Sequence, residues 1–221
     1  MVSDDKSGSD GRRQVGMRRR AKTRSSIIAA AFEIFGEEDG LFARIEDVVA
    51  KAGVTRATFY NHFAGMQDLR EALTHEVTHD FLESVTATLA RLPDARERSA
   101  ASVRFYLRRA AGDRRWAWSM MNMSASGVIF GSETYRQAEQ TIREGIEEGV
   151  LPIPSYELGR DVILGTTLAA MGSLARGRMP ADYPEAVAGY ALCGLGVPLE
   201  DAKRIAHLPL PALVSLPAGK E

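Results

Sequence analysis

Residues 45–63 read IEDVVAKAGVTRATFYNHF, and this stretch decides the fold. It predicts two short helices joined by a tight turn at Gly53, since glycine adopts positive φ without a steric cost. Thr55 is expected to cap the second helix, because its hydroxyl can accept a hydrogen bond from a free backbone N–H. Phe59 and Phe63 are four residues apart and give that helix only a narrow apolar side. These features are typical of a helix-turn-helix, whose second helix enters the DNA major groove.

The remaining faces of the second helix carry side chains that bind phosphates and base edges. We expect Arg56 and Asn61 to read bases, because arginine suits guanine and asparagine suits adenine. Tyr60 and His62 are better placed to position the DNA backbone, and Thr58 lies on the same polar side.

The segment AGVTRATFYNHF resembles the signature of TetR-family transcriptional regulators, over residues 24–73. In that signature a Gly-Val-Ser/Thr turn leads into a helix with a Thr-aromatic-Tyr-x-His-Phe core. The family usually has Ser or Thr at the start of the first motif helix, where it touches phosphate. This sequence has Ala43-Arg44 there, so we expect Arg44 to supply that contact; Met66 stands where the family tends to have a lysine. The full set of predicted DNA contacts is Arg44, Thr55, Arg56, Thr58, Tyr60, Asn61 and His62.

The resemblance implies an all-α protein in which a three-helix head, residues 18–65, reads DNA. The larger helical body, residues 66–221, is then expected to bind a small apolar or aromatic ligand and to form a homodimer. Residues 1–17 lack a periodic apolar pattern and are expected to be disordered. The first helix is expected to run from about Thr23 to Glu38, where apolar residues recur at helical spacing. Repression of a palindromic DNA operator, relieved by the ligand, is the commoner outcome in the family, and we expect no cofactor. A ligand-independent DNA-binding protein with a solid core is an alternative.

Charge is distributed unevenly along the 221 residues, although the net charge is only −1. Residues 12–66 hold 10 Lys and Arg against 6 Asp and Glu, whereas residues 67–221 hold 17 against 20. A basic end on a slightly acidic body suits a DNA-binding head. Cys193 is the single cysteine, which excludes an intrachain disulfide. We expect neither export nor a membrane span, and therefore a cytoplasmic protein.

Seven basic residues and no acid occur between residues 12 and 24. Two interpretations remain open: a solvated tail, or an arm that lies along the DNA phosphates or in the minor groove. The residues are Arg12, Arg13, Arg18, Arg19, Arg20, Lys22 and Arg24.

A long helix is predicted over residues 66–91, with apolar residues recurring every four positions from Leu69 to Leu89. It contains His75-Glu76-Val77-Thr78-His79, the pattern H-E-x-x-H of zinc peptidases. A zinc-dependent hydrolase is therefore an alternative function, and a regulatory metal site with Glu83 one turn on is another. The sequence offers no later third ligand in a suitable context, so we expect exposed polar residues and no metal.

The segment 114–123 holds both tryptophans and three methionines, which suits either a ligand cavity or an ordinary core. In the preceding helix we expect Arg104, Arg108 and Arg109 to face solvent. The candidate ligand-binding residues are Phe81, Phe105, Trp116, Trp118, Met120, Met121, Phe130 and Tyr135.

Two late helices, 156–176 and 183–195, are rich in glycine and alanine. Glycine costs about 1 kcal/mol against alanine in a helix, so this composition indicates close helix packing. The resemblance implies a homodimer through residues 156–195; packing within the chain is the alternative. Asp182 and Glu185 predict a capping box at the second of these helices.

Overall fold

The computed structural model describes residues 6–124 and 129–215. Within these ranges it is built from helices and has no strand, which confirms the predicted all-α class. In chain order the elements are α1 (Lys6–Phe35), η1 (Gly40–Phe42), α2 (Ile45–Ala52), α3 (Arg56–Tyr60), α4 (Met66–Leu89), α5 (Ala95–Gly112), α6 (Arg114–Met123), α7 (Gly131–Glu147), α8 (Tyr156–Arg176), α9 (Tyr183–Gly194) and α10 (Leu199–Ala206).

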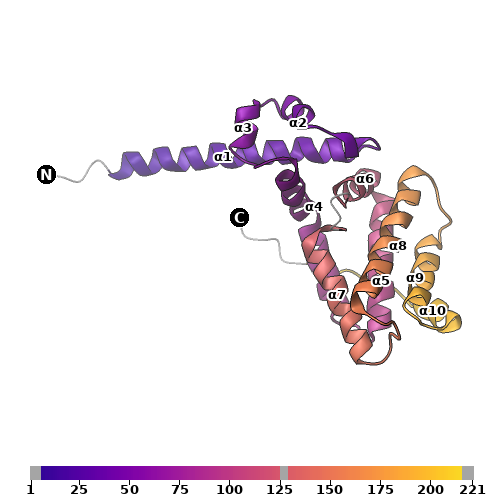
Figure 1. Ribbon diagram of the computed structural model, residues 1–221. Coiled ribbons are helices and arrows are strands. Elements are labelled where there is room, and N and C mark those ends of the chain that lie inside the picture. Colours follow the sequence, from indigo (N-terminus) through magenta and orange to yellow (C-terminus); the bar gives the residue numbers. More distant parts are fainter. Residues whose placement is uncertain (1–5, 125–128, 216–221) are drawn as a thin grey trace.

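The molecule has a head of three helices and a body of helical layers (Figure 1). Helices α2 and α3 lie along one side of the long α1, and α4 leads from the head into the body. In the body, α5 packs against α7, α8 and α9, and α10 packs against α9. None of the described helices combines the length and apolar character that crossing a bilayer requires.

The head is held by an apolar core to which all three helices contribute. Four side chains of this core are fully buried: Ile27 and Phe35 of α1, Val48 of α2 and Phe59 of α3. Phe63, which follows α3, is nearly so. Burying a side chain of this size contributes roughly 1.5–3 kcal/mol. The five-residue α3 is too short to persist alone, so this packing fixes its direction.

The first helix is longer than the sequence pattern predicts. We expected it to begin near Thr23, whereas it begins at Lys6, so residues 6–17 are helical in the structure rather than disordered. No proline interrupts the backbone hydrogen bonds in this stretch. Residues 13–22 are exposed, so the first half of α1 projects from the head as an arm (Figure 1). Residues 1–5 lie outside the described range.

A buried ion pair joins α5 to α9 and corrects two expectations. Arg104 is only 5% exposed and does not face solvent; its Nε donates to Glu185 Oε1 at 3.0 Å and its Nη1 donates to the Leu208 carbonyl at 2.8 Å. Arg108 also donates to Glu185, at 2.7 Å. Glu185 is thus bound to two arginines instead of completing a capping box, and Asp182 makes no side-chain cap.

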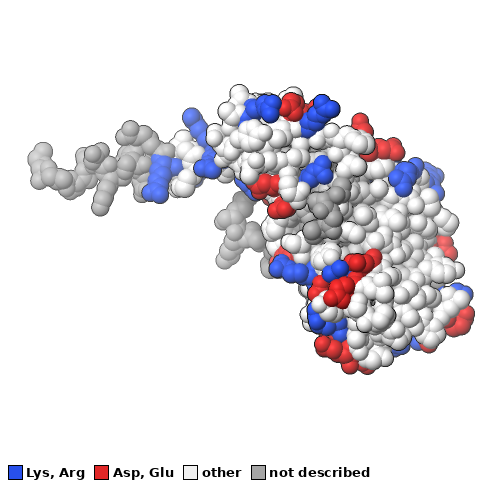
Figure 2. Space-filling view, viewed as in Figure 1, with Lys and Arg blue, Asp and Glu red and all other residues white. Residues whose placement is uncertain are grey.

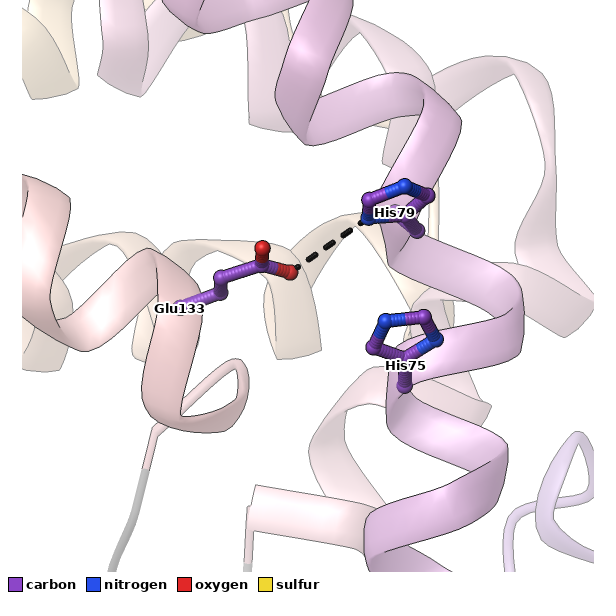
Figure 3. A group of neighbouring side chains, drawn as sticks. All are labelled: His75, His79 and Glu133. Atoms are coloured by element: carbon purple, nitrogen blue, oxygen red, sulfur yellow. Dashed lines mark ion pairs between the residues drawn. The ribbon is translucent and has the colours of Figure 1, made fainter. Parts of the chain in front are cut away.

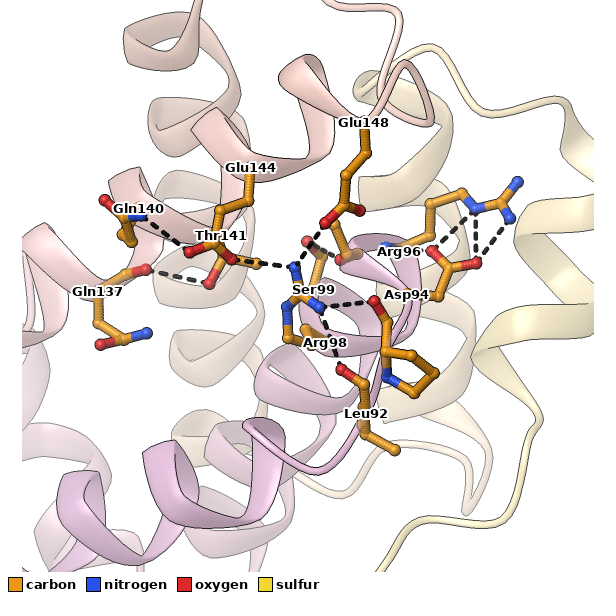
Figure 4. A network of polar contacts seen from close by, with 12 residues as sticks. Leu92, Asp94, Arg96, Arg98, Ser99, Gln137, Gln140, Thr141, Glu144 and Glu148 are labelled. Carbon is orange, nitrogen blue, oxygen red and sulfur yellow. Dashed lines mark hydrogen bonds and ion pairs between the residues drawn. The ribbon is translucent and has the colours of Figure 1, made fainter.

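A second polar network ties the turn between α4 and α5 to α7 (Figure 4). Arg98 donates to the carbonyls of Leu92 and Pro93 at 3.0 and 2.8 Å and to Glu144 Oε2 at 3.0 Å. Its side chain is mostly buried, whereas Glu144 is partly exposed. The network fixes the end of the body that lies farthest from the head (Figure 1).

Candidate DNA interface and ligand cavity

The helix-turn-helix has the backbone geometry that the sequence predicts. Gly53 adopts φ 66° at the turn after α2. Thr55 caps α3, because its hydroxyl accepts a hydrogen bond from the Thr58 N–H at 3.1 Å. The Thr58 hydroxyl lies 2.9 Å from the Thr55 hydroxyl, so the two side chains bond to each other. The cap and the turn together aim the polar side of α3 away from the core.

Arg56 is the most constrained of the exposed side chains on α3. Its Nη1 lies 2.8 Å from Glu46 Oε1 of α2, and both side chains are more than half exposed. A hydrogen bond with Tyr60 and the charge of Glu46 raise the pKa of Arg56. The contact with Glu46 thus links α3 to α2 across the turn, while Tyr60, on the same helix as Arg56, is 49% exposed.

Basic residues from α1 join this surface behind α3. Arg20 Nη2 donates to the carbonyl of Asn61 at 3.1 Å, and the Arg24 guanidinium lies 5.4 Å from the centre of the Phe63 ring. Partial burial, followed by the charges of Arg20 and Arg24, lowers the pKa of His62. This positive environment disfavours the protonated form of His62. Figure 2 shows basic side chains along the arm and over the head.

The predicted contacts come from two places in the head: Arg44 precedes α2, and the others lie at or beside α3. Asn61, the C-terminal cap of α3, is exposed, whereas His62 is partly buried. Arg44 is the exposed N-terminal cap of α2, and its backbone N–H donates to the Asp47 carboxylate at 2.7 Å.

A cavity of about 50 Å³ lies within the body, between α4, α5, α7 and α8. Its apolar wall includes Leu82, Val103 and Ile142, and Phe130 lies at its border. The hydroxyl of Tyr106 lies 3.0 Å from that of Thr134. Burial raises the pKa of Tyr106 to about 12. Among the described residues no charged side chain lines the cavity, so it suits an uncharged molecule with at most a few polar groups.

Other polar groups at the cavity are already bonded within their own helices. Ser99, Thr141 and Thr167 donate to the carbonyls of Ala95, Gln137 and Ile163. Their oxygens keep lone pairs that can accept hydrogen bonds from a ligand. The side chain of Gln137 also lines the cavity.

The predicted ligand residues are divided among three places. Phe130 borders the cavity, whereas Phe81 and Trp116 border a separate groove on the other side of α4. These aromatics and Tyr106 form one cluster, with Tyr106 and Phe130 ring centres 5.1 Å apart. The remaining predicted residues are packed elsewhere: Phe105, Trp118 and Met120 are buried, Met121 packs near Gly172, and Tyr135 lies under Arg160.

Tyr106, Thr134 and Gln137 line the cavity but are not among the ligand-binding residues that the sequence predicts. They come from α5 and α7, and their spacing along the chain matches no motif. Only an apolar helix face interrupted by hydroxyls, as in α7, hints at a lined cavity.

The H-E-x-x-H residues border two different grooves, and the described residues give no support to the alternative of a zinc hydrolase. His75 borders a groove beside the start of α7, whereas Glu76 borders the groove that contains Phe81 and Trp116.

The head and body are joined by hydrogen bonds around Asn122 of α6. Its side-chain amide donates to the carbonyls of Phe35 and Glu37 at 2.9 and 2.8 Å. Arg70 of α4 donates to the carbonyls of Asn122 and Leu41, both at 3.2 Å, and its guanidinium lies 5.0 Å from the centre of the Phe35 ring. Burial lowers the pKa of Arg70. We call Arg70 and Asn122 the head–body joint.

Solved structures show where else this fold occurs. RolR in complex with resorcinol is 24% identical, with a TM-score of 0.71 over 90% of this chain and 100% of that chain. RolR without ligand is 23% identical, with a TM-score of 0.68 over 85% and 98% of the two chains. FadR from Bacillus subtilis in complex with stearoyl-CoA is 21% identical, with a TM-score of 0.59 over 77% and 96%. At this level of identity the likeness establishes the fold. No curated protein matches the sequence.

Two family models match the sequence and divide it as the structure does. The model of bacterial regulatory proteins of the tetR family matches residues 27–73, which span the helix-turn-helix. The model of the tetracyclin repressor-like C-terminal domain matches residues 94–208, which form most of the body. Since the second match alone covers more than half of the 221 residues, the chain belongs to the tetR family of bacterial regulatory proteins.

Proposed function

We propose that this ligand-responsive, DNA-binding transcriptional regulator is a homodimeric repressor, released from a palindromic operator by a small uncharged apolar or aromatic molecule. The observation that carries the proposal is the combination of an exposed, capped α3 with an uncharged cavity on α4, the helix that leads to the head. Two copies of α3 would read half-sites about one DNA turn, roughly 34–36 Å, apart.

The size of the cavity supports a mechanism of release. An engineered cavity of about 150 Å³ holds benzene in another protein, whereas this cavity measures about 50 Å³. A ring-sized ligand must therefore push its walls apart, and α4 is one of those walls. Because interiors are close-packed, such a displacement is passed along the helix instead of being absorbed. The head would then move relative to its dimer partner.

Filling the cavity is expected to remove the ligand response. In Ala138→Leu, a cavity-lining residue of α7 gains carbons that take up the free space, so ligand affinity should fall by roughly tenfold or more. DNA binding should persist and no longer respond to ligand. Resorcinol, the molecule bound in the RolR structure, and neutral substituted phenols are the probes, in a thermal-shift assay and in DNA-binding titrations. Ala111→Leu, at an exposed position of α5, is the control.

The head–body joint is expected to carry the response. Asn122→Leu keeps a similar volume but removes both amide hydrogen bonds to the end of α1. Coupling through such a contact is worth about 0.5–2 kcal/mol, so the ligand-induced drop in DNA affinity should shrink roughly 2- to 30-fold. Ligand affinity in the absence of DNA should change little. Gln140→Leu, on the exposed side of α7, serves as control; an unchanged DNA response in Asn122→Leu would remove the joint from the mechanism.

Dimerisation is proposed to use the apolar outer face of α8 and α9. Leu158 and Tyr190 are 48% and 68% exposed. A methyl group added at Gly165 meets no other atom, so this glycine leaves open space beside the face. Gly159 and Gly172, in contrast, pack against Ile142 and Met121 within the chain. Figure 2 shows few charges over this side of the body.

Replacing Tyr190 by aspartate is expected to break the dimer. An isologous interface places the new charge in both copies, next to an apolar partner surface. We expect the dimer dissociation constant to rise at least tenfold, as measured by analytical ultracentrifugation, with a matching loss of operator affinity. Phe42→Asp changes an exposed residue of the head and is the control for oligomeric state. A Tyr190→Asp protein that remains dimeric would place the interface elsewhere.

A further inference from the structure

Two histidines and a glutamate from separate elements meet beside the ligand cavity. His75 and His79 lie one turn apart on α4, with parallel rings whose centres are 4.7 Å apart and whose planes differ by 14°. Glu133 reaches them from the first turn of α7 (Figure 3). One possible ligand atom from each residue lies within 4.8 Å of the other two. Glu133 is the third ligand that sequence reasoning did not supply.

The two nitrogens of His79 have different surroundings, and the difference is informative. Nδ1 is buried, makes no hydrogen bond and lies 3.5 Å from Glu133 Oε2. Nε2, the other ring nitrogen, lies 3.5 Å from Glu83 Oε1. A histidine that binds a metal through one nitrogen usually directs its other N–H to a carboxylate, which fixes the ring and its tautomer. His79 has that arrangement, with Nδ1 as the free ligand.

We propose that His75, His79 and Glu133 bind a divalent transition-metal ion, with Zn²⁺ as the best fit. Two imidazoles and a carboxylate suit zinc, which takes nitrogen at about 2.0–2.1 Å and carboxylate oxygen at about 2.0–2.2 Å. A groove of about 270 Å³, bordered by His75 and Glu133, gives the ion access and leaves room for water as a fourth ligand. Rotations of the partly exposed Glu133 and His75 side chains can bring the ligand atoms to these distances.

The ion would connect the helix that leads to the head with the helix that walls the ligand cavity. Phe130 borders both the cavity and the groove, so the two sites share a residue. Fixing α4 against the start of α7 opposes the separation that a ligand requires. Metal binding is therefore expected to raise DNA affinity in the presence of ligand, a consequence that rests on the proposed function, whereas the metal site itself does not.

Cobalt titration of the protein without an affinity tag tests the site directly, because tetrahedral Co²⁺ bound by histidine absorbs visible light. We expect one ion per chain in the wild type, displaced by Zn²⁺. His79→Ala should abolish the absorption, and Glu83→Gln should weaken binding roughly 10- to 100-fold. His207→Ala, at an exposed histidine of the body, and Glu76→Gln, on the other side of α4, should match the wild type.

Two results would overturn the metal site: no stoichiometric Co²⁺ binding by the wild type, or equal binding by folded His79→Ala and wild-type protein. Melting curves without metal establish that each variant is folded. A separate DNA titration with ligand, with and without Zn²⁺, decides the regulatory consequence. If Co²⁺ binds through His79 but Zn²⁺ leaves DNA affinity unchanged, the metal site stands and its regulatory role is rejected.

Discussion

Replacing Glu185 by glutamine is expected to lower the free energy of unfolding by about 3–5 kcal/mol, because it leaves a buried arginine without its counter-ion. Arg104 is 5% exposed and Glu185 is 7% exposed, so water cannot take the place of the lost charge. Chemical denaturation at a fixed protein concentration, which a dimer requires, measures the change. Glu200→Gln, at a fully solvated position of α10, should change stability by no more than a few tenths of a kcal/mol.

The same ion pair predicts a dependence of stability on pH. Burial by itself would raise the pKa of Glu185, but hydrogen bonds from Arg108 and Arg104 outweigh it and lower the pKa. The carboxylate therefore stabilises the fold fully above its unfolded-state pKa of about 4.3, and this stabilisation is lost as the pH falls through the lower folded value. The wild type should lose more stability below pH 5 than Glu185→Gln does.

A double variant distinguishes an uncompensated charge from a packing defect. Replacing both Arg104 and Glu185 by apolar residues of similar volume removes the charges together, which is often neutral or stabilising for a buried pair. Arg104→Met with Glu185→Leu should therefore recover most of the stability lost in Glu185→Gln. If Glu185→Gln is as stable as the wild type, the ion pair does not hold α5 to α9.

Replacing Arg56 by alanine is expected to weaken binding to the preferred DNA roughly 5- to 150-fold and to relax its sequence preference. Arg56 is exposed on α3, and its surface ion pair with Glu46 is weak enough to give way to a guanine. Fluorescence anisotropy with the preferred duplex and a scrambled duplex measures both effects. Arg136→Ala, on the exposed side of α7, is the control for a simple loss of charge.

Deletion of residues 1–17 is the variant to compare with Arg56→Ala, because it should lower DNA affinity without changing sequence preference. This change removes Arg12 and Arg13 from the basic stretch. It should weaken binding to all sequences alike and flatten the dependence of affinity on salt, since these two arginines would act through phosphates. The observed Arg20 contact with Asn61 lies outside the deleted stretch and should persist. If Arg56→Ala and the deletion affect preferred and scrambled DNA equally, Arg56 does not read a base.

The helix-turn-helix was predictable because its determinants are local. Gly53 at the turn, the cap at Thr55 and the four-residue spacing of Phe59 and Phe63 all lie within a few residues of the structure that they specify. The first residue of α1 could not be predicted, because weak helix formers lower the stability of a helix without marking where it starts.

Long-range partners explain the other differences. The sequence predicts an exposed Arg104 because its partner, Glu185, lies 81 residues later in the chain. The cavity is built from four helices, and Tyr106 and Thr134 meet across it although no spacing relates them. The proposed metal site is intermediate: His75 and His79 are visible as a motif in the sequence, whereas Glu133 joins them only through the packing of α7 on α4.

The measurement that tests the central claim most directly is fluorescence anisotropy with DNA from immediately upstream of the protein's own coding region. A scrambled duplex is the control, and two salt concentrations separate phosphate contacts from base contacts. We predict tight binding that prefers the upstream DNA, retains that preference at the higher salt and is lost on addition of a ligand that fits the cavity. Failure to bind either duplex at low salt would contradict the assignment of α3 as a DNA-reading helix.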